Sequence, residues 1–215
     1  ELESRLAEAM PKASAAGKTA IKELRAHISE IAVEKPLLGH DFTALRRASL
    51  SRLSAEHGDD LSSAQIDELM ETFIAARSNV SQHLYDDVVP ALRALREAGV
   101  CIGAVTDGNT DISRAGGELS ELFDFALTAA DAGSSKSAVL PFLQAAYASG
   151  HHPSNIVHVG DSISKDLCGA LRCGFRALLL GRVGHSHSAE EEALLPSADE
   201  QVWRRVSGFL DLVRN

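Results

Sequence analysis

The stretch NIVHVGDSISKDLCGALRCG, residues 155–174, decides the fold. It opens with a short apolar and β-branched run at 156–159, which predicts a buried strand. Asp161 follows that strand at once, and Asp166 comes where apolar residues at helical spacing predict the start of a helix that ends at Gly174. Mg²⁺ is typically bound by one or two carboxylates with waters and a phosphate, so the two acids could hold this cation. The alternative for this stretch alone is a loop with two solvated acids, one of which caps the helix.

Length and composition bound the kind of protein. The chain has 215 residues, of which 45% are hydrophobic, enough for a sizeable core in one or two domains. The net charge of -9 argues against nucleic acid and against an anionic membrane as partners, although a local site can still bind a small anionic substrate. No apolar run reaches the roughly 18 residues of a membrane helix. The acidic, helical start ELESRLAEAM is unlike a signal or transit peptide.

The three cysteines indicate a reducing compartment. Cys101, Cys168 and Cys173 fall inside predicted strands or helices, and the sequence has no CxxC pair. We therefore expect reduced, buried core residues in an intracellular protein. The cytoplasm and the interior of an organelle, such as a plastid or mitochondrion, both fit this expectation.

Residues 1–84 predict an all-helical domain. Apolar residues recur at helical spacing through this half, broken by two turns that contain glycine, and no stretch is a convincing strand. Arg46, Arg47 and Arg77 are the basic residues of this half that could meet an anionic ligand. The alternative is that they are surface arginines whose aliphatic stems pack on the bundle.

Residues 85–215 change to alternating helices and strands. Strands are predicted at 100–105, 123–128, 156–159 and 175–180, with a further short strand near 202–203, and helices at 88–98, 135–149 and 206–213. This alternation predicts an α/β domain with a Rossmann-like parallel sheet and helices on both faces. Such sheets bind ligands outside the carboxyl ends of their strands.

Three polar clusters fall at those strand ends, at 106–109, 134–136 and 161–166. A fourth polar stretch, His185-Ser186-His187 followed by acids at 190–192, could be imagined as a metal site. We interpret it instead as a solvated loop and the acidic start of a helix.

The order of these clusters resembles motifs two, three and four of the haloacid dehalogenase superfamily. The matching residues are a strand that ends in Thr106, a later Lys136, and Gly160-Asp161 with Asp166 beyond. The helical first half resembles the inserted cap of that superfamily. HDFTALRRASL at 40–50 and FIAARSNV at 73–80, together with VTDGN at 105–109, resemble the subgroup of flavin mononucleotide and riboflavin-pathway phosphatases with a helical cap.

The resemblance implies a Mg²⁺-dependent hydrolase that acts on a small phosphorylated metabolite through an aspartyl-phosphate. Thr106 and the backbone amides of Asp107 and Gly108 would bind one phosphate oxygen, and Lys136 would bind another oxygen and the nucleophile's carboxylate. The substrate would be flavin mononucleotide or the phosphorylated ribitylaminouracil precursor of riboflavin.

The same resemblance implies a metal site and a cap contribution. Asp161 would bind Mg²⁺ directly, and Asp166 would either join it or orient the metal-bound water and Lys136. Arg46 and Arg77 of the cap are the candidates for substrate specificity.

Three departures from the family pattern stand out. Asp107 occupies the position after the motif-two threonine, where the subgroup usually has Asn, and an extra acid beside a phosphate is unfavourable unless it turns away or binds a cation. Ser137 follows the lysine where Pro is common. The first motif, DxDxT, which supplies the nucleophile and the general acid/base, is absent, and the nearest string, at 40–43, belongs to the cap match.

In the family the strand of that first motif lies at the centre of the sheet, between the strands predicted at 100–105 and 156–159. Losing a central strand would leave two rows of backbone groups unpaired, at a cost of about 1–3 kcal/mol for each buried group. We therefore expect either that the natural protein continues upstream of Glu1 or that another chain or segment fills the gap. The first is favoured because the sequence starts inside a predicted helix without a cap.

Two other functions stay open. A catalytically inactive protein of this fold could serve as a structural or binding subunit of a larger assembly; the missing motif and Asp107 favour this, whereas the intact Thr106, Lys136, Asp161 and Asp166 oppose it. Dehalogenation or phosphomutase chemistry is the third option. The sequence encoded upstream of Glu1 separates the first two.

Overall fold

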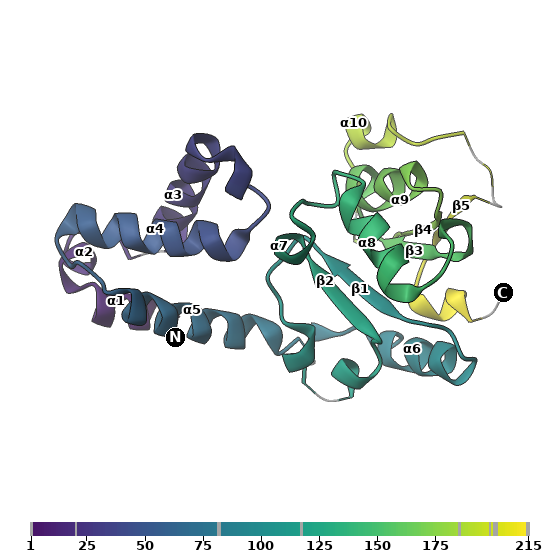
Figure 1. The fold of residues 1–215 in the computed structure, drawn as a ribbon, viewed down its shortest axis with the longest axis horizontal. Helices are drawn as coiled ribbons and strands as arrows, with labels where there is room; N and C mark the ends of the chain where they lie inside the picture. Colours follow the sequence, from purple (N-terminus) through teal and green to yellow (C-terminus); the bar gives the residue numbers. More distant parts are fainter. Residues whose placement is uncertain are drawn as a thin grey trace.

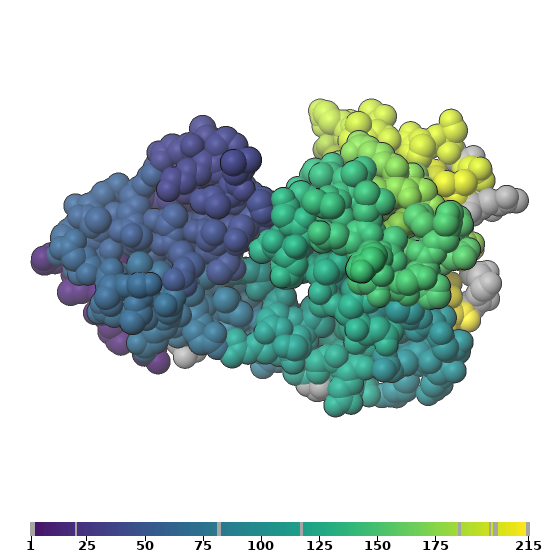
Figure 2. Space-filling view, viewed as in Figure 1, coloured from purple at the N-terminus to yellow at the C-terminus, as the bar shows by residue number. Residues whose placement is uncertain are grey.

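The structure is a computed structural model that describes residues 2–19, 21–80, 83–116, 118–184, 186–197, 199 and 202–213. The chain forms two masses, a helical lobe from residues 2–80 and an α/β lobe from residues 83–213 (Figures 1 and 2). No helix among the described residues is long and apolar enough to cross a membrane.

The helical lobe is a small bundle with its own apolar core. Its helices are α1 (Leu2–Ala9), α2 (Pro11–Ala15), α3 (Ile21–Glu34), the 3₁₀ turn η1 (Pro36–Leu38), α4 (Phe42–His57) and α5 (Ser63–Ser78). The core joins α1, α4 and α5 through buried Leu6, Leu53 and Leu69. Asp41 caps α4 by accepting from the backbone N–H of Ala44 at 2.8 Å, and Ser62 forms a capping box at the start of α5.

Within its described residues the α/β lobe contains five short strands, all paired in parallel. The strands are β1 (Gly103–Thr106), β2 (Phe125–Thr128), β3 (Val157–Gly160), β4 (Arg176–Leu180) and β5 (Trp203–Val206). The helices are α6 (Val88–Glu97), α7 (Ala129–Ala132), α8 (Leu140–Ser149), α9 (Cys168–Arg172) and α10 (Ala189–Glu192), with short turns η3 (Ile112–Arg114), η4 (Leu119–Glu121), η5 (Pro153–Asn155), η6 (Ile163–Leu167) and η7 (Phe209–Leu212). Figure 1 shows α8 and α9 on one side of the strands and α6 on the other. The predicted fold class, a parallel sheet with helices on both faces together with a helical segment, is confirmed.

The strands form two sheets rather than one. β1 pairs with β2, and β3 pairs with β4, which pairs with β5. β1 and β3 are not paired with each other, as the sequence predicted for the strands that end at Thr106 and Gly160. A cavity of about 1120 Å³ lies between them, with walls that include Ile102, Phe142 and Val159.

The ion pair between Asp87 and Arg182 links the two sides of this cavity. Asp87, just before α6, accepts from Arg182 Nη2 at 2.7 Å, and Arg182 follows β4. The other oxygen of Asp87 accepts from the backbone N–H of Phe209 at 2.6 Å. Burial alone would raise the pKa of Asp87, but the Arg182 and Phe209 hydrogen bonds hold it below its ordinary value. The helix beside the first sheet is thereby fastened to the segment that leaves the second.

Several predicted boundaries were wrong. The helix predicted at 135–149 begins only at Leu140, because Pro141 is suited to the first turn of a helix and residues 134–139 form turns before it. The helix predicted at 206–213 is a 3₁₀ turn, and Val206 instead ends β5. The three cysteines were expected to be buried, but Cys101 is exposed, because β1 starts three residues later than predicted, and Cys168 and Cys173 are half-buried.

Candidate active site

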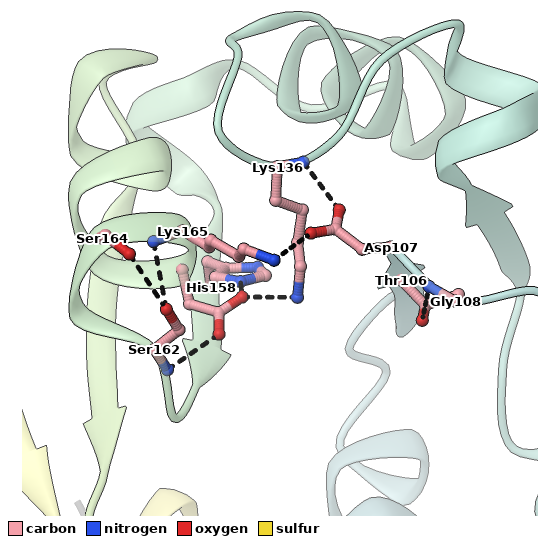
Figure 3. A network of polar contacts seen from close by, with 9 residues as sticks. Thr106, Asp107, Gly108, Lys136, His158, Ser162, Ser164 and Lys165 are labelled. Atoms are coloured by element: carbon pink, nitrogen blue, oxygen red, sulfur yellow. Dashed lines mark hydrogen bonds and ion pairs between the residues drawn. The ribbon is translucent and has the colours of Figure 1, made fainter. Parts of the chain in front are cut away.

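The candidate site lies where the loops after β1 and β3 meet the turn before α8. Parallel strands that point the same way bring their carboxyl ends together, so residues distant in sequence gather here. Figure 3 shows Lys136 between the loop that carries Thr106 and Gly108 and the segment that carries Ser162 and Lys165. The side chains come from three separate segments of the α/β lobe.

Asp166 is the buried centre of the site, with 3% of its surface exposed. It lies in η6, a single π-helical turn. Its Oδ1 accepts from Lys136 Nζ at 2.6 Å and contacts His158 Nε2 at 3.0 Å, and its Oδ2 accepts from the backbone N–H of Ser162 at 3.0 Å. Burial alone would raise the pKa of Asp166, but the His158 hydrogen bond and the Lys136 charge hold it well below its ordinary value. Asp166 is therefore ionised and fixes the ammonium group of Lys136.

Gly160 at the end of β3 makes room for this carboxylate. A methyl group on Gly160 would lie 2.5 Å from Asp166 Oδ2, closer than real side-chain contacts allow. The acid thus lies against the bare backbone of the strand end. His158 is two residues earlier, so the alternation of a strand places it on the same face as Gly160, toward Asp166.

Asp107, the unexpected acid of the sequence, reaches across to Lys136 and Lys165 (Figure 3). Its Oδ1 accepts from the backbone N–H of Lys136 at 2.7 Å, which fastens the loop after β1 to the turn before α8. Its Oδ2 forms an ion pair with Lys165 Nζ at 3.1 Å. The acid thus binds a cation, which is one of the two conditions that make it tolerable beside a phosphate.

Thr106 and Gly108 form the other wall. The hydroxyl oxygen of Thr106 accepts from the backbone N–H of Gly108 at 3.0 Å, so its own proton can be donated to a ligand. Lys136, which the sequence placed at the start of a helix, lies in the turn four residues before α8. The position still brings its side chain to the strand ends, because Asp107 and Asp166 hold its backbone and its ammonium group.

Asp161 is exposed at the tip of β3. Its backbone carbonyl accepts from His187 Nε2 at 2.7 Å, and His187 Nδ1 lies 3.5 Å from Glu192. In the part of the chain that the structure describes, no three His, Cys, Asp or Glu side chains form a group able to hold a metal. His185 lies outside the described residues.

Arg46 and Arg77 lie apart from this site, in the helical lobe, where they line a separate pocket. Among the described residues, hydrogen bonds from Asn109 and Asp111 join the loop after β1 to that lobe. Asn109 Nδ2 donates to Thr43 Oγ1 at 3.2 Å, and the backbone N–H of Asp111 donates to Ser78 Oγ at 3.0 Å. Both acceptors are on the helices that carry the two arginines.

Sequence reasoning did not single out His158, Ser162 or Lys165. His158 had a usable signal, since it is the one polar residue of an apolar strand and is in alternation with Gly160. No sequence signal marked Lys165, because its role depends on Asp107, which lies 58 positions earlier in the sequence and becomes a neighbour only in the folded protein.

A family model for haloacid dehalogenase-like hydrolases matches residues 1–174. The chain belongs to the haloacid dehalogenase-like hydrolase family. It is 31% identical to a 2-haloacid dehalogenase from Pseudomonas syringae pv. tomato, whose crystal structure it matches with a TM-score of 0.81 over 99% of this chain and 86% of that chain. The crystal structure of a haloacid dehalogenase-type phosphatase from Thermococcus onnurineus matches with a TM-score of 0.60 at 23% identity, over 99% and 90% of the two chains, which shows the shared fold.

A glyceraldehyde 3-phosphate phosphatase from Methanopyrus kandleri is 34% identical over 103 residues. That alignment covers 46% of this chain and 43% of the relative, so this chain matches less than half of that relative's length. The comparisons thus establish a hydrolase family that includes both phosphatases and dehalogenases.

Proposed function

We propose that this family member hydrolyses a small phosphomonoester with Mg²⁺, by transferring the phosphoryl group to an aspartate. The observation that carries the proposal is the Lys136 ammonium group, held 2.6 Å from buried Asp166 beside the Thr106 loop. Phosphoryl transfer is catalysed chiefly by positioning and by neutralising charge on the phosphate oxygens. A fixed cation opposite a hydroxyl donor suits that task. The relative named as a phosphatase supports the same reaction class.

Each side chain then has a distinct part. Lys136 would neutralise one phosphate oxygen and the attacking carboxylate, and Thr106 would donate its hydroxyl proton to a second oxygen. Asp166 is the residue that positions Lys136, since both of its oxygens are engaged by donors from the protein. Lys165 and Asp107 hold the loops that carry these groups together.

The exposed carboxylate of Asp161 is the residue that would hold Mg²⁺. Magnesium is a hard cation that prefers oxygen ligands such as a carboxylate. It commonly keeps several waters and binds only one or two protein carboxylates. Asp166 fits a direct metal ligand less well because the described donors already occupy its two oxygens. The bound cation would neutralise charge on the transferred phosphoryl group.

The nucleophile is the part that this sequence does not supply, since the DxDxT string of the family is absent. We place it on a β-strand that occupies the cavity between β1 and β3. Within the described residues both strands have one unpaired edge toward this cavity, and the walls are largely apolar. An added parallel strand would join the two sheets and end beside Lys136 and Asp161. A chain of these 215 residues preceded by an apolar strand ending in Asp-x-Asp-Gly-Thr is called the strand-extended chain below.

Dehalogenation is the second candidate, favoured by the similarity to the 2-haloacid dehalogenase of Pseudomonas syringae. The two reactions release different products. Phosphate release from p-nitrophenyl phosphate and chloride release from 2-chloropropionate, each measured with Mg²⁺ and with EDTA, separate them. We expect the strand-extended chain to release phosphate only, and only with Mg²⁺. Chloride release that is insensitive to EDTA would replace the phosphatase proposal, and a folded chain that releases neither product would favour an inactive subunit of an assembly.

Asp161→Asn tests the metal assignment. It preserves the shape of the side chain but removes a charge from the site proposed for a divalent cation, so the apparent Mg²⁺ affinity of the strand-extended chain should fall about tenfold to a hundredfold. The measurement is phosphate release against Mg²⁺ concentration. Asp86→Asn, the same change at an exposed acid outside the three segments that form the site, is the control and should leave the Mg²⁺ dependence unchanged. Equal curves for Asp161→Asn and the unmodified protein would rule out Asp161 as the ligand.

A further inference from the structure

The helical lobe contains a second cavity that the proposed reaction leaves without a role. It has a volume of about 190 Å³ and lies among α3, α4 and α5. Its walls are mainly apolar, with Leu24, Ile28 and Met70 among them, but three arginines also line it, Arg25, Arg46 and Arg77. No acid is among the residues that line this cavity, which we call the arginine pocket.

Arg46 is the partly buried cation of the arginine pocket. Its Nη1 is fully buried and has no hydrogen-bond partner. Its guanidinium lies over the ring of Phe73, 4.2 Å from the centroid, and Arg77 lies over the same ring at 5.5 Å. Burial, with the charges of Arg77 and Arg25, lowers the pKa of Arg46 to about 10, so the group remains charged at neutral pH.

Neighbouring arginines of the same helix are treated differently. Arg47 forms an ion pair with Asp67, and Arg52 forms one with Glu34. For Arg46 and Arg77 the described residues provide no such acid. The lobe therefore gathers positive charge in this cavity while pairing it elsewhere on α4.

A buried N–H group of a cation that lacks a partner is costly, because the desolvation of that group is not repaid. A guanidinium group forms paired hydrogen bonds to a carboxylate or phosphate, which would satisfy the open N–H groups. The apolar walls would in turn cover a small hydrocarbon group. The volume is adequate for a ring, since an apolar cavity of about 150 Å³ holds benzene.

Two of the helices that line the arginine pocket, α4 and α5, join it to the candidate active site. Thr43, which contacts Asn109, is one helical turn before Arg46 on α4, a rise of about 5 Å. Ser78, which accepts from the Asp111 N–H, directly follows Arg77 on α5. Asn109 and Asp111 belong to the loop that begins at Thr106. The arginine pocket thus belongs to the lobe that contacts the loop where a molecule would bind at Thr106.

We infer that the arginine pocket binds a carboxylate borne on a small apolar or aromatic group, and that this is the far end of the substrate. The word substrate here rests on the proposed function; the carboxylate site itself rests on Arg46, Arg77 and Phe73. The substrate class is then a phosphomonoester with a second acid group. Flavin mononucleotide carries no carboxylate and should be a poorer substrate than such a compound.

Binding of benzoate to the 215-residue chain, measured by titration calorimetry without Mg²⁺, tests the site independently of turnover. Arg46→Met should weaken benzoate binding about tenfold to a hundredfold, as expected for lost hydrogen bonds to a charged group. It should also raise the melting temperature of the free protein, because a partly buried charge without an acid partner is removed. Arg47→Met is the matched control one position along the helix and should bind benzoate as the unmodified chain does. Benzyl alcohol, with the same ring and no charge, should bind at least tenfold more weakly than benzoate.

Three outcomes would overturn the inference. They are benzoate binding that is unchanged in Arg46→Met, benzyl alcohol binding equal to benzoate, and binding of inorganic phosphate at Arg46 in place of benzoate. The pocket and the reaction can fail separately. If benzoate binding depends on Arg46 but the strand-extended chain has no phosphatase activity, the carboxylate site stands and the proposed reaction is refuted. If the strand-extended chain is an active phosphatase but benzoate binding does not depend on Arg46, only the carboxylate site is refuted.

Discussion

Lys136→Met is expected to lower the turnover of p-nitrophenyl phosphate by the strand-extended chain about 10²–10³-fold, the range seen when one charge-stabilising donor is removed from an active site. Methionine keeps the length and the apolar stem of lysine but has no charge. The ammonium group is held 2.6 Å from Asp166 in the folded protein, so no reorganisation is needed to meet the developing phosphate charge. Turnover at saturating Mg²⁺ is the quantity to measure.

The control for this change is Lys35→Met, an exposed lysine of the helical lobe, which should retain full turnover. Circular dichroism before the assay establishes that the Lys136→Met protein is folded. Turnover within threefold of the unmodified protein would show that Lys136 serves only to neutralise Asp166.

Asp166→Asn is expected to lower the free energy of unfolding at pH 7 by about 3 kcal/mol, because it leaves Lys136 largely buried beside a neutral amide. The single tryptophan, Trp203, lies in β5 and packs against the cluster that contains Phe142, so its fluorescence reports unfolding of the α/β lobe. Urea titration followed by this signal gives the free energy. Asp161→Asn, the same chemical change at an exposed acid nearby, should cost little stability.

The deficit of Asp166→Asn should shrink in acid. The pKa of Asp166 is lowered in the folded protein, whereas the unfolded chain takes the ordinary value of about 3.9. A lowered pKa contributes stability that is complete above the unfolded value and is lost as pH falls from that value toward the folded one. Below about pH 4 the unmodified protein should therefore lose the stability contributed by ionised Asp166. The Asp166→Asn variant lacks this contribution at every pH, so the difference between the two proteins should become smaller. A deficit that stays constant from pH 7 to pH 3 would contradict this account of Asp166.

The sequence contained enough to predict the fold class and the loops of the site. Apolar runs that end in Thr106 and in Gly160-Asp161 mark the carboxyl ends of β1 and β3, and that pattern depends only on local composition. The setting of Lys136 was harder to predict, because the start of α8 is set by Pro141 and the lysine is held in a preceding turn by two acids from other segments.

Features that depend on packing were missed for a physical reason. Arg46 and Arg47 are adjacent and chemically identical in the sequence, yet one lies in a cavity without an acid and the other pairs with Asp67. Only the packing of α4 against α3 and α5 distinguishes them. Cys101 likewise depends on where β1 begins, a boundary that propensity alone leaves uncertain by a few residues.

Release of inorganic phosphate from p-nitrophenyl phosphate with Mg²⁺, compared between the strand-extended chain and the 215 residues alone, tests most directly whether a strand between β1 and β3 completes a phosphatase. We expect turnover by the strand-extended chain, abolished when the first aspartate of the added Asp-x-Asp-Gly-Thr is changed to asparagine. We expect none by the 215 residues alone, which have no DxDxT string to supply the proposed nucleophile. Trp203 fluorescence establishes that both proteins are folded. Turnover by the 215 residues alone, or no turnover by a folded strand-extended chain, would contradict the proposal that a strand between β1 and β3 completes a phosphatase.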